Sequence, residues 1–229
     1  MNAKKLLNYT LVLSIYIQVI TFIIGLFALL IKIPTDYVLI KELFYLELIV
    51  QVVEGIFYIW LAFNIKKVIN ITPNRYMDWA ITTPTMLITL ISYLLFLQAK
   101  AKNSTQNLNL SSIFKSNYKT LIPILILNWM MLLFGYLGEV KVIPIYYSVV
   151  LGFIPFFIYY YMIYKNFVDK HTSMSGYNIY IYFVFFWGLY GIAAFLPYYI
   201  KNISYNILDL FSKNFFGIFL AYIIYTRSY

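Results

Sequence analysis

Lys213 is the residue of this chain whose type and position point most directly to chemistry. It lies in the middle of an apolar run from Tyr205 to Tyr225. A helix rises 1.5 Å per residue, which puts Lys213 roughly 15 Å deep, near the midplane of a ~30 Å hydrocarbon core. An unpaired ammonium there is costly, and Asp209 lies four residues earlier on the same helical face. Two interpretations are open: a structural ion pair, or an amine that forms a Schiff base with a carbonyl ligand while Asp209 balances its charge.

The composition is that of a membrane protein. Of the 229 residues, 63% are hydrophobic and only 11% are charged, too few to cover the surface of a soluble globule. The absence of cysteine excludes disulfides, thiol nucleophiles and cysteine-based metal sites. The single histidine, His171, lies in a polar stretch that we expect to be a loop, so no metal site is expected. The net charge of +9 lies mostly in loops and gives no reason to expect nucleic acid as a partner.

Seven apolar segments are long enough to cross a bilayer. The first is too long for the apolar part of a signal peptide, so we take it as a span. The sequence therefore predicts an all-α membrane protein, a single domain over 1–229 built as a bundle of seven transmembrane helices, with one long polar linker over 99–118. The expected spans are Leu6–Ile31, Tyr37–Phe63, Arg75–Leu97, Leu121–Gly138, Ile143–Tyr164, Asn178–Ile200 and Ile203–Tyr225.

The basic residues indicate an orientation. With the N-terminus outside, nine Lys and Arg residues fall on the cytoplasmic side and six on the outer side. Because cytoplasmic loops carry the excess of Lys and Arg, we expect an extracellular N-terminus and a cytoplasmic C-terminus.

Most of the acidic residues lie within expected membrane spans, where burying a charge costs the most free energy. Five of the eight fall within expected spans. Ionisable groups within a membrane usually face a cavity and mark an ion or proton pathway. These five residues are Glu42, Glu47, Glu54, Asp78 and Asp209.

The third span carries a second polar face. Arg75, Asp78 and Thr82 are spaced three and four residues apart, so they line one side of a helix. Pro84 follows and is expected to kink this helix, with the freed carbonyl satisfied by a neighbouring group.

These motifs resemble the microbial rhodopsins over nearly the whole chain. The third span has the pattern Arg-x-x-Asp-Trp-x-x-Thr-Thr-Pro, and the seventh has Asp-x-x-x-Lys. The resemblance implies all-trans retinal bound covalently to Lys213 as a protonated Schiff base. It makes Asp78 and Asp209 the counterions, and it places Arg75 beneath them on the extracellular side.

The same resemblance implies a retinal pocket from the third, fourth and sixth spans. Asn128 stands where many members of the family have Asp, and Gly191 stands where they usually have Pro. Any one of Trp79, Trp187 and Tyr190, taken alone, would more often be a core residue than part of a binding pocket. The implied pocket residues are Trp79, Thr83, Met86, Asn128, Met131, Gly135, Trp187 and Tyr190.

The residues of a proton pump are largely missing. Pumps of this family normally have a carboxylate eleven residues after the counterion, where this chain has Thr89, so the three positions read Asp78, Thr82 and Thr89. No Asp or Glu lies between Tyr190 and Asp209 to release a proton outside.

The second span is rich in polar residues instead. Glu47, Gln51 and Glu54 are spaced four and three residues apart and form one stripe, which a hydrated cation path would explain. This span and the pattern Asp-Leu-x-Ser-Lys-Asn-x-x-Gly resemble the channelrhodopsins. In channelrhodopsins a central gate joins a Ser of the first helix, a Glu of the second helix and the Asn after the retinal Lys. The resemblance implies that the corresponding residues here are Ser14, either Glu47 or Glu54, and Asn214.

The sequence therefore favours a light-gated cation channel, similar to the group-1 viral rhodopsins, and not an enzyme. The alternative is a light-driven outward proton pump without its usual cytoplasmic donor. A photosensor would need a transducer partner, and the tails carry no sign of one. The expected partners are the lipid bilayer and permeant cations or protons, and an oligomer is compatible with the sequence.

Overall fold

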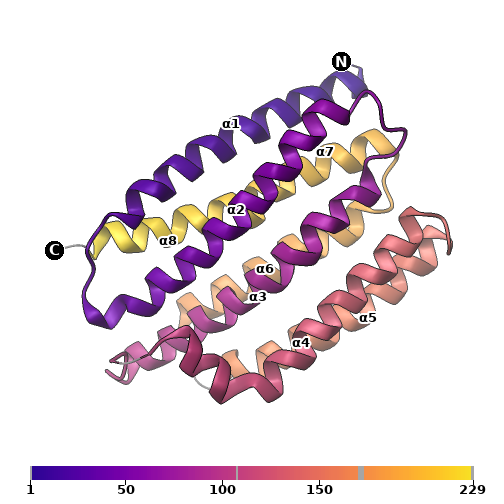
Figure 1. The fold of residues 1–229 in the computed structure, drawn as a ribbon. Coiled ribbons are helices and arrows are strands. Elements are labelled where there is room, and N and C mark those ends of the chain that lie inside the picture. Colours follow the sequence, from indigo (N-terminus) through magenta and orange to yellow (C-terminus); the bar gives the residue numbers. More distant parts are fainter. Residues whose placement is uncertain (1, 107, 170–172, 228–229) are drawn as a thin grey trace.

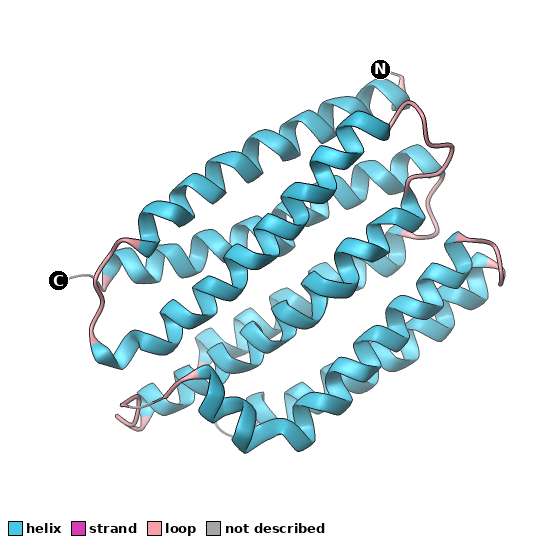
Figure 2. Cartoon of the chain, in the orientation of Figure 1, coloured by secondary structure: helices cyan, strands magenta, loops and turns pink. Residues whose placement is uncertain are grey.

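The computed structural model describes residues 2–106, 108–169 and 173–227, and these form a bundle of helices that run side by side (Figures 1 and 2). Lys170 and His171, which the sequence places in a loop, lie outside the described residues. No strand occurs in the described part of the chain. The helices are α1 (Ala3–Leu29), η1 (Thr35–Tyr37), α2 (Val38–Asn64), α3 (Thr72–Ala101), α4 (Leu110–Glu139), α5 (Ile145–Ile163), η2 (Tyr164–Val168), α6 (Met174–Ala193), α7 (Tyr198–Asp209), η3 (Leu210–Asn214) and α8 (Phe215–Thr226).

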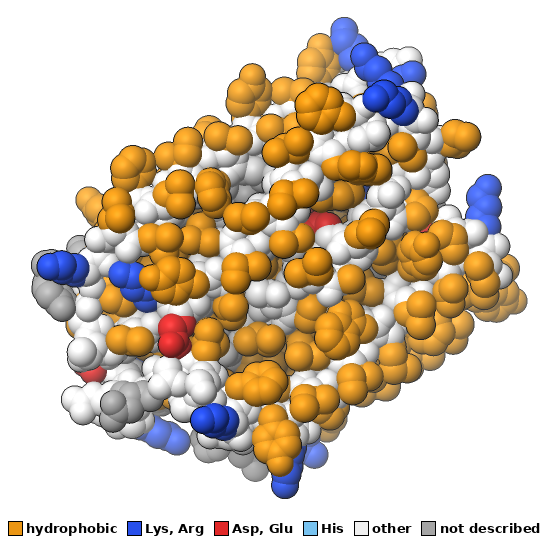
Figure 3. Space-filling model, viewed as in Figure 1, with side chains coloured by type: hydrophobic (Ala, Val, Ile, Leu, Met, Phe, Trp, Pro, Cys, Tyr) orange, Lys and Arg blue, Asp and Glu red, His pale blue; other side chains and the backbone are white. Residues whose placement is uncertain are grey.

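The predicted seven-helix membrane architecture is confirmed. Among the described residues, six helical rods are long and apolar enough to cross a membrane, with α5–η2 and α7–η3–α8 each forming one continuous rod. The seventh, α6, is 20 residues long, and its many Tyr residues lower its hydropathy. Figure 3 shows hydrophobic side chains over the flanks of the bundle and Lys and Arg towards its ends. The chain is an integral, multi-pass membrane protein.

Several expected boundaries are wrong. Helix α4 begins at Leu110 rather than Leu121, so half of the expected linker over 99–118 is helical. Asn109 and Ser112 form a capping box there, each side chain accepting a hydrogen bond from the other's backbone N–H. Helix α6 ends at Ala193 rather than Ile200, because Pro197 opens the next helix. Hydropathy finds the buried middle of a helix but not its polar, capped ends.

Pro84 lies inside α3, and the carbonyl that it leaves free is satisfied by a neighbouring helix, as expected. A proline has no N–H, so the carbonyl of Ala80, four residues earlier, has no partner in its own helix. The indole N–H of Trp129 on α4 donates to that oxygen at 2.9 Å. The carbonyl that Pro84 leaves free is therefore a point of attachment between α3 and α4.

The seventh rod is not a regular helix. Leu210–Asn214 form a π-helical turn between α7 and α8, and Lys213 lies within it. The hydroxyl of Tyr182 donates to the carbonyl of Phe211 in this turn at 2.7 Å. Single π-helical turns are frequent at functional sites because they re-aim side chains.

The interior of the bundle is polar on one side and apolar on the other. A large apolar cluster packs α5, α6 and α8 against α2 and α3. Between α1, α2, α3 and the seventh rod, many buried side chains are instead polar or charged, and we call this polar set the polar column. The polar column comprises Thr10, Ser14, Gln18, Thr21, Glu47, Gln51, Glu54, Tyr58, Arg75, Asp78, Thr82, Thr89, Asn202, Asn206, Asp209, Lys213 and Asn214.

Candidate functional site

Lys213 stands at the centre of the polar column, with carboxylates from three helices around it. Its Nζ donates to Oδ2 of Asp78 at 2.6 Å and lies 3.7 Å from Oδ1 of Asp209. Oε1 of Glu54 is 3.9 Å away. The predicted proximity of Asp78 and Asp209 to this amine is confirmed, and Glu54 joins them.

The two aspartates have different surroundings. Asp209 accepts hydrogen bonds at 2.7 Å from the hydroxyls of Tyr58 and Tyr190, and Arg75 lies 3.4 Å from it. Asp78 is held directly by Lys213, and its Oδ1 has no hydrogen-bond partner among the described residues. Asp209 is therefore fixed from three sides, whereas Asp78 is free to respond to a change at the amine.

Arg75 fills the polar column on the side of the N-terminus. Its Nε donates to Oδ1 of Asn202 at 3.0 Å, and one terminal nitrogen donates to Oδ1 of Asn206 at 2.6 Å. The guanidinium also lies over the rings of Phe57 and Tyr205, each 5.6 Å from the ring centre. These contacts bind the cation tightly between α3 and α7.

The positively and negatively charged groups of this centre are unequal in number. Lys213 and Arg75 supply two positive charges, and three carboxylates surround them. Both oxygens of Glu54 lack a hydrogen-bond partner within the described chain. A buried carboxylate without hydrogen bonds is costly as an anion, so the charge balance of the centre depends on whether Glu54 holds a proton.

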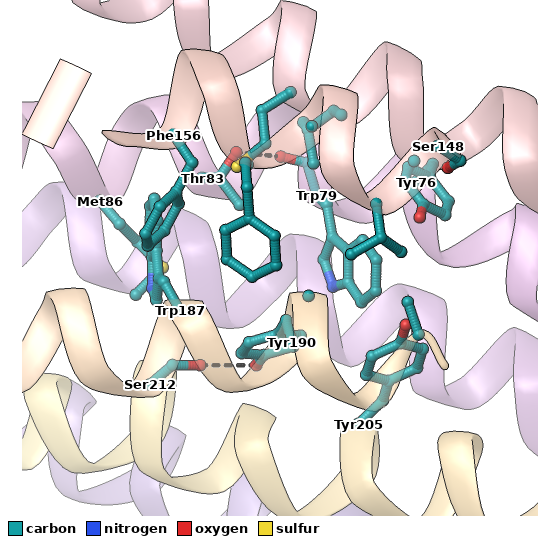
Figure 4. Close-up of a pocket in the computed structure, with 18 of the residues that line it drawn as sticks. Tyr76, Trp79, Thr83, Met86, Ser148, Phe156, Trp187, Tyr190, Tyr205 and Ser212 are labelled. Carbon is teal, nitrogen blue, oxygen red and sulfur yellow. Dashed lines mark hydrogen bonds between the residues drawn. The ribbon is translucent and has the colours of Figure 1, made fainter. Parts of the chain in front are cut away.

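Lys213 also reaches an aromatic cavity between α3, α4, α5 and α6 (Figure 4). Trp187 and Met86 lie towards one end of this cavity, and Tyr76 and Tyr205 lie towards the other. Tyr190 lies between them and forms a hydrogen bond with Ser212 at 2.8 Å.

Two glycines shape this cavity. A Cβ atom at Gly135 would lie 2.6 Å from the hydroxyl oxygen of Tyr76, and one at Gly191 would lie 2.5 Å from the ring of Phe153. Both aromatic side chains therefore occupy positions that only glycine leaves open. At Gly191, where the family usually has proline, the ring of Phe153 packs against the glycine. Helix α6 continues past this position to Ala193.

Seven of the eight expected pocket residues line the cavity. The exception is Asn128, whose amide nitrogen donates to the hydroxyl of Thr83 at 2.8 Å and supports the wall of the cavity from behind. The seven are Trp79, Thr83, Met86, Met131, Gly135, Trp187 and Tyr190.

The stripe on α2 faces inward as predicted. Glu47 and Glu54 are 0% exposed and Gln51 is 4% exposed. Neither oxygen of Glu47 has a hydrogen-bond partner in the described part of the chain, although the carboxylate approaches the hydroxyl of Thr89. The amide of Gln51 packs against Gly217 of α8, where a side chain would collide with it.

The structure does not bring Ser14 and Asn214 together as the expected gate. Ser14 donates to the backbone carbonyl of Asn206 at 3.3 Å, whereas Asn214 donates to the hydroxyl of Thr21 at 2.9 Å. Ser14 and Thr21 are seven residues apart on α1, roughly 10 Å along the helix axis. The two residues therefore belong to different levels of the polar column.

Three further expected pathway residues form hydrogen bonds with backbone groups. Glu42 lies towards the opposite end of α2 and accepts from the backbone N–H of Leu110 at 2.6 Å, so it holds the start of α4. The hydroxyls of Thr82 and Thr89 bond back to carbonyls of their own helix at 3.0 Å. Both threonines are fully buried on the inner face of α3.

Sequence reasoning missed several members of the site. Tyr58 continues the α2 stripe four residues beyond Glu54, and Asn202 and Asn206 precede Asp209 at the same helical spacing. The periodicity that revealed the acidic residues could therefore have revealed these neutral ones. Tyr76 and Ser212 had no such signal, because their place depends on the packing of other helices.

Comparisons with known proteins show what this chain is similar to in sequence and in fold. A sequence profile of the family described as bacteriorhodopsin-like protein matches residues 10–227. The green-light absorbing proteorhodopsin of Gamma-proteobacterium EBAC31A08 is 27% identical over 167 residues, which cover 65% of this chain and only 59% of that protein. The crystal structure of viral rhodopsin OLPVRII has a TM-score of 0.81 and 28% identity, covering 96% of this chain and 98% of that one. A thermophilic rhodopsin at 20% identity shares the fold, with a TM-score of 0.72 over 99% of this chain and 95% of that one.

Proposed function

Because this chain belongs to the bacteriorhodopsin-like family of microbial rhodopsins, we propose that it is a retinal-binding light-gated cation channel. Proteins of this family bind retinal through a Schiff base. We propose Lys213 as the attachment site, Asp78 as the principal counterion and Asp209 as a second, fixed one. The Lys and Arg distribution supports an extracellular N-terminus.

The residues present fit this cofactor. An amine lies at an elongated aromatic cavity, and the polyene would contact apolar side chains such as Trp79, Trp187 and Met86. When bound, retinal absorbs light and changes shape by isomerisation about a double bond. The chain's own contribution is to hold the amine between Asp78 and Asp209, and to exclude water from the aromatic side.

The observation that carries the channel proposal is the polar column. It runs beside the cavity between α1, α2, α3 and the seventh rod, and many of its buried polar atoms have no partner among the described residues. Such atoms are costly in a dry interior and are normally satisfied by water or ions. Gln18, Glu47, Gln51, Glu54 and Asn214 contribute atoms of this kind, so hydration of the column offsets their burial.

Arg75 and its partners close the column on the N-terminal side in this structure. Its bonds to Asn202, Asn206 and Asp209 leave a guanidinium across the path. We propose that conduction requires this cluster to rearrange after a change at Lys213, with Asp209 as the direct link between the two cations.

One observation favours the alternative, a light-driven outward proton pump. The carboxylate of Glu47 approaches the hydroxyl of Thr89, the position at which pumps of this family normally carry their own carboxylate. A carboxylate from α2 is therefore available on the side from which a pump takes up protons.

Replacing Glu47 with Gln tests the path while sparing the chromophore. Glu47 has no ion pair with Lys213, unlike Glu54 at 3.9 Å. We expect Glu47→Gln to change the amplitude or cation selectivity of the photocurrent, because a carboxylate in a narrow path sets the local potential for cations. The visible absorption band should stay in place.

Asp169→Asn is the matched control, since Asp169 is exposed and lies at the end of η2 rather than on α2. A Glu47→Gln current that is indistinguishable from the control in size and reversal potential would remove α2 from the path.

A further inference from the structure

A second charged site lies at the N-terminal-side end of the bundle, away from Lys213. Nζ of Lys201 on α7 donates to Oε1 of Glu139 at 2.7 Å, and Glu139 is the last residue of α4. Their side chains are 11% and 4% exposed. This buried ion pair therefore joins two rods that lie apart in the sequence.

The ion pair borders a cavity of about 490 Å³ that opens at this end of the molecule. The α2–α3 loop contributes Asn70, and the α4–α5 and α6–α7 turns supply the rest of the wall. Lys141 is the other charged residue that lines this cavity in the described chain, and it is exposed. The cavity thus has a net positive lining, and Glu139 is the one carboxylate that balances it.

The ion pair is coupled to the Arg75 cluster by direct neighbours. Lys201 precedes Asn202, which accepts from Arg75 at 3.0 Å. Tyr205, one turn further along α7, lies beneath the guanidinium of Arg75, 5.6 Å from the ring centre. No carboxylate lies between Tyr190 and Asp209 in the sequence, and Glu139 brings one to this region from α4.

We propose that the Glu139–Lys201 pair controls the charge of the N-terminal-side mouth of the transport pathway. This inference rests on the proposed channel function. While paired, the two residues neutralise each other, so the exposed Lys141 is the one uncompensated charge of the described lining that faces cations approaching the Arg75 cluster. Removing either partner leaves the other uncompensated, and the two removals have opposite effects on cations.

The test is a comparison of photocurrents under one cation gradient, normalised to the visible absorbance of each variant. Lys201→Gln leaves a free carboxylate and should raise the cation current, whereas Glu139→Gln leaves a free ammonium and should lower it. A unit charge about 10 Å from a hydrated path changes the current about twofold. The exchanged variant Glu139→Lys with Lys201→Glu restores the pair and should return the current to the wild-type level. Lys67→Gln, at an exposed lysine on the same side, should leave it unchanged.

Opposite shifts in the two single variants, with recovery in the exchanged variant, support the inference. If the wild-type current reverses with voltage, equal shifts in the two single variants, or no shift in either, overturn this inference alone. A wild-type current that never reverses overturns the proposed function and this inference with it. If a single variant forms no pigment, the exchanged variant decides the question. An exchanged variant that forms a pigment and carries the wild-type current supports the inference. An exchanged variant that forms a pigment but carries no current contradicts it.

Discussion

Replacing Lys213 with Ala is expected to abolish the visible absorption band that forms with all-trans retinal. Lys213 is the lysine that lines the aromatic cavity in the described chain, and a Schiff base needs a primary amine. Without it, retinal added to the purified protein should absorb as the free aldehyde does. Absorption spectroscopy during reconstitution measures this directly.

The alanine variant also removes a cation from among three carboxylates, so it could lose its fold. Lys213→Arg answers this point, because the guanidinium keeps the charge but does not form a stable Schiff base with retinal. Both variants should lack the band, while Lys67→Ala, at an exposed lysine, should keep it. An unaltered band in either Lys213 variant would mean that retinal is attached elsewhere.

Neutralising Asp78 to Asn is expected to shift the band to longer wavelength. Asp78 is the carboxylate nearest to Lys213, at 2.6 Å, and it lacks the fixed hydrogen bonds of Asp209. A nearby negative charge localises the positive charge at the nitrogen, so removing it lets that charge spread along the polyene. As the pH is raised, the variant should also lose its visible band at a lower pH than the wild type does. The reason is that the nearest anion no longer stabilises the protonated Schiff-base nitrogen.

Asp209 remains in that variant, so complete loss of colour at neutral pH is not expected. Asp169→Asn, an exposed carboxylate outside the bundle, should leave both the spectrum and its titration unchanged. Identical spectra and titrations for Asp78→Asn and the wild type would place Asp78 outside the influence of the chromophore.

The sequence could predict which face of each helix turns towards the interior of the bundle, because burial in a membrane decides it. Charged side chains in hydrocarbon must face the interior, so the stripe of Glu47, Gln51 and Glu54 and the inward face of Arg75 and Asp78 followed from spacing. The meeting of Lys213 with Asp78 followed from the resemblance to the microbial rhodopsins, which motifs on two helices carry.

The parts that it could not predict depend on the relative height and packing of helices. Spacing along α1 and η3 does not say at which level Ser14 and Asn214 stand, and the structure gives each a different partner. The pair of Glu139 and Lys201 joins positions 62 residues apart. The π-helical turn around Lys213 also has no signature in apolar periodicity.

The central claim is that light opens a passive cation path along the polar column, and a current–voltage recording under illumination tests it most directly. A passive path carries current in either direction, so the photocurrent should change sign near the equilibrium potential of the permeant cation and should follow that potential when the gradient is changed. A pump's direction is set by its photocycle rather than by the gradient. Outward photocurrent that persists at strongly negative voltage, with no reversal in any cation gradient, would contradict the account.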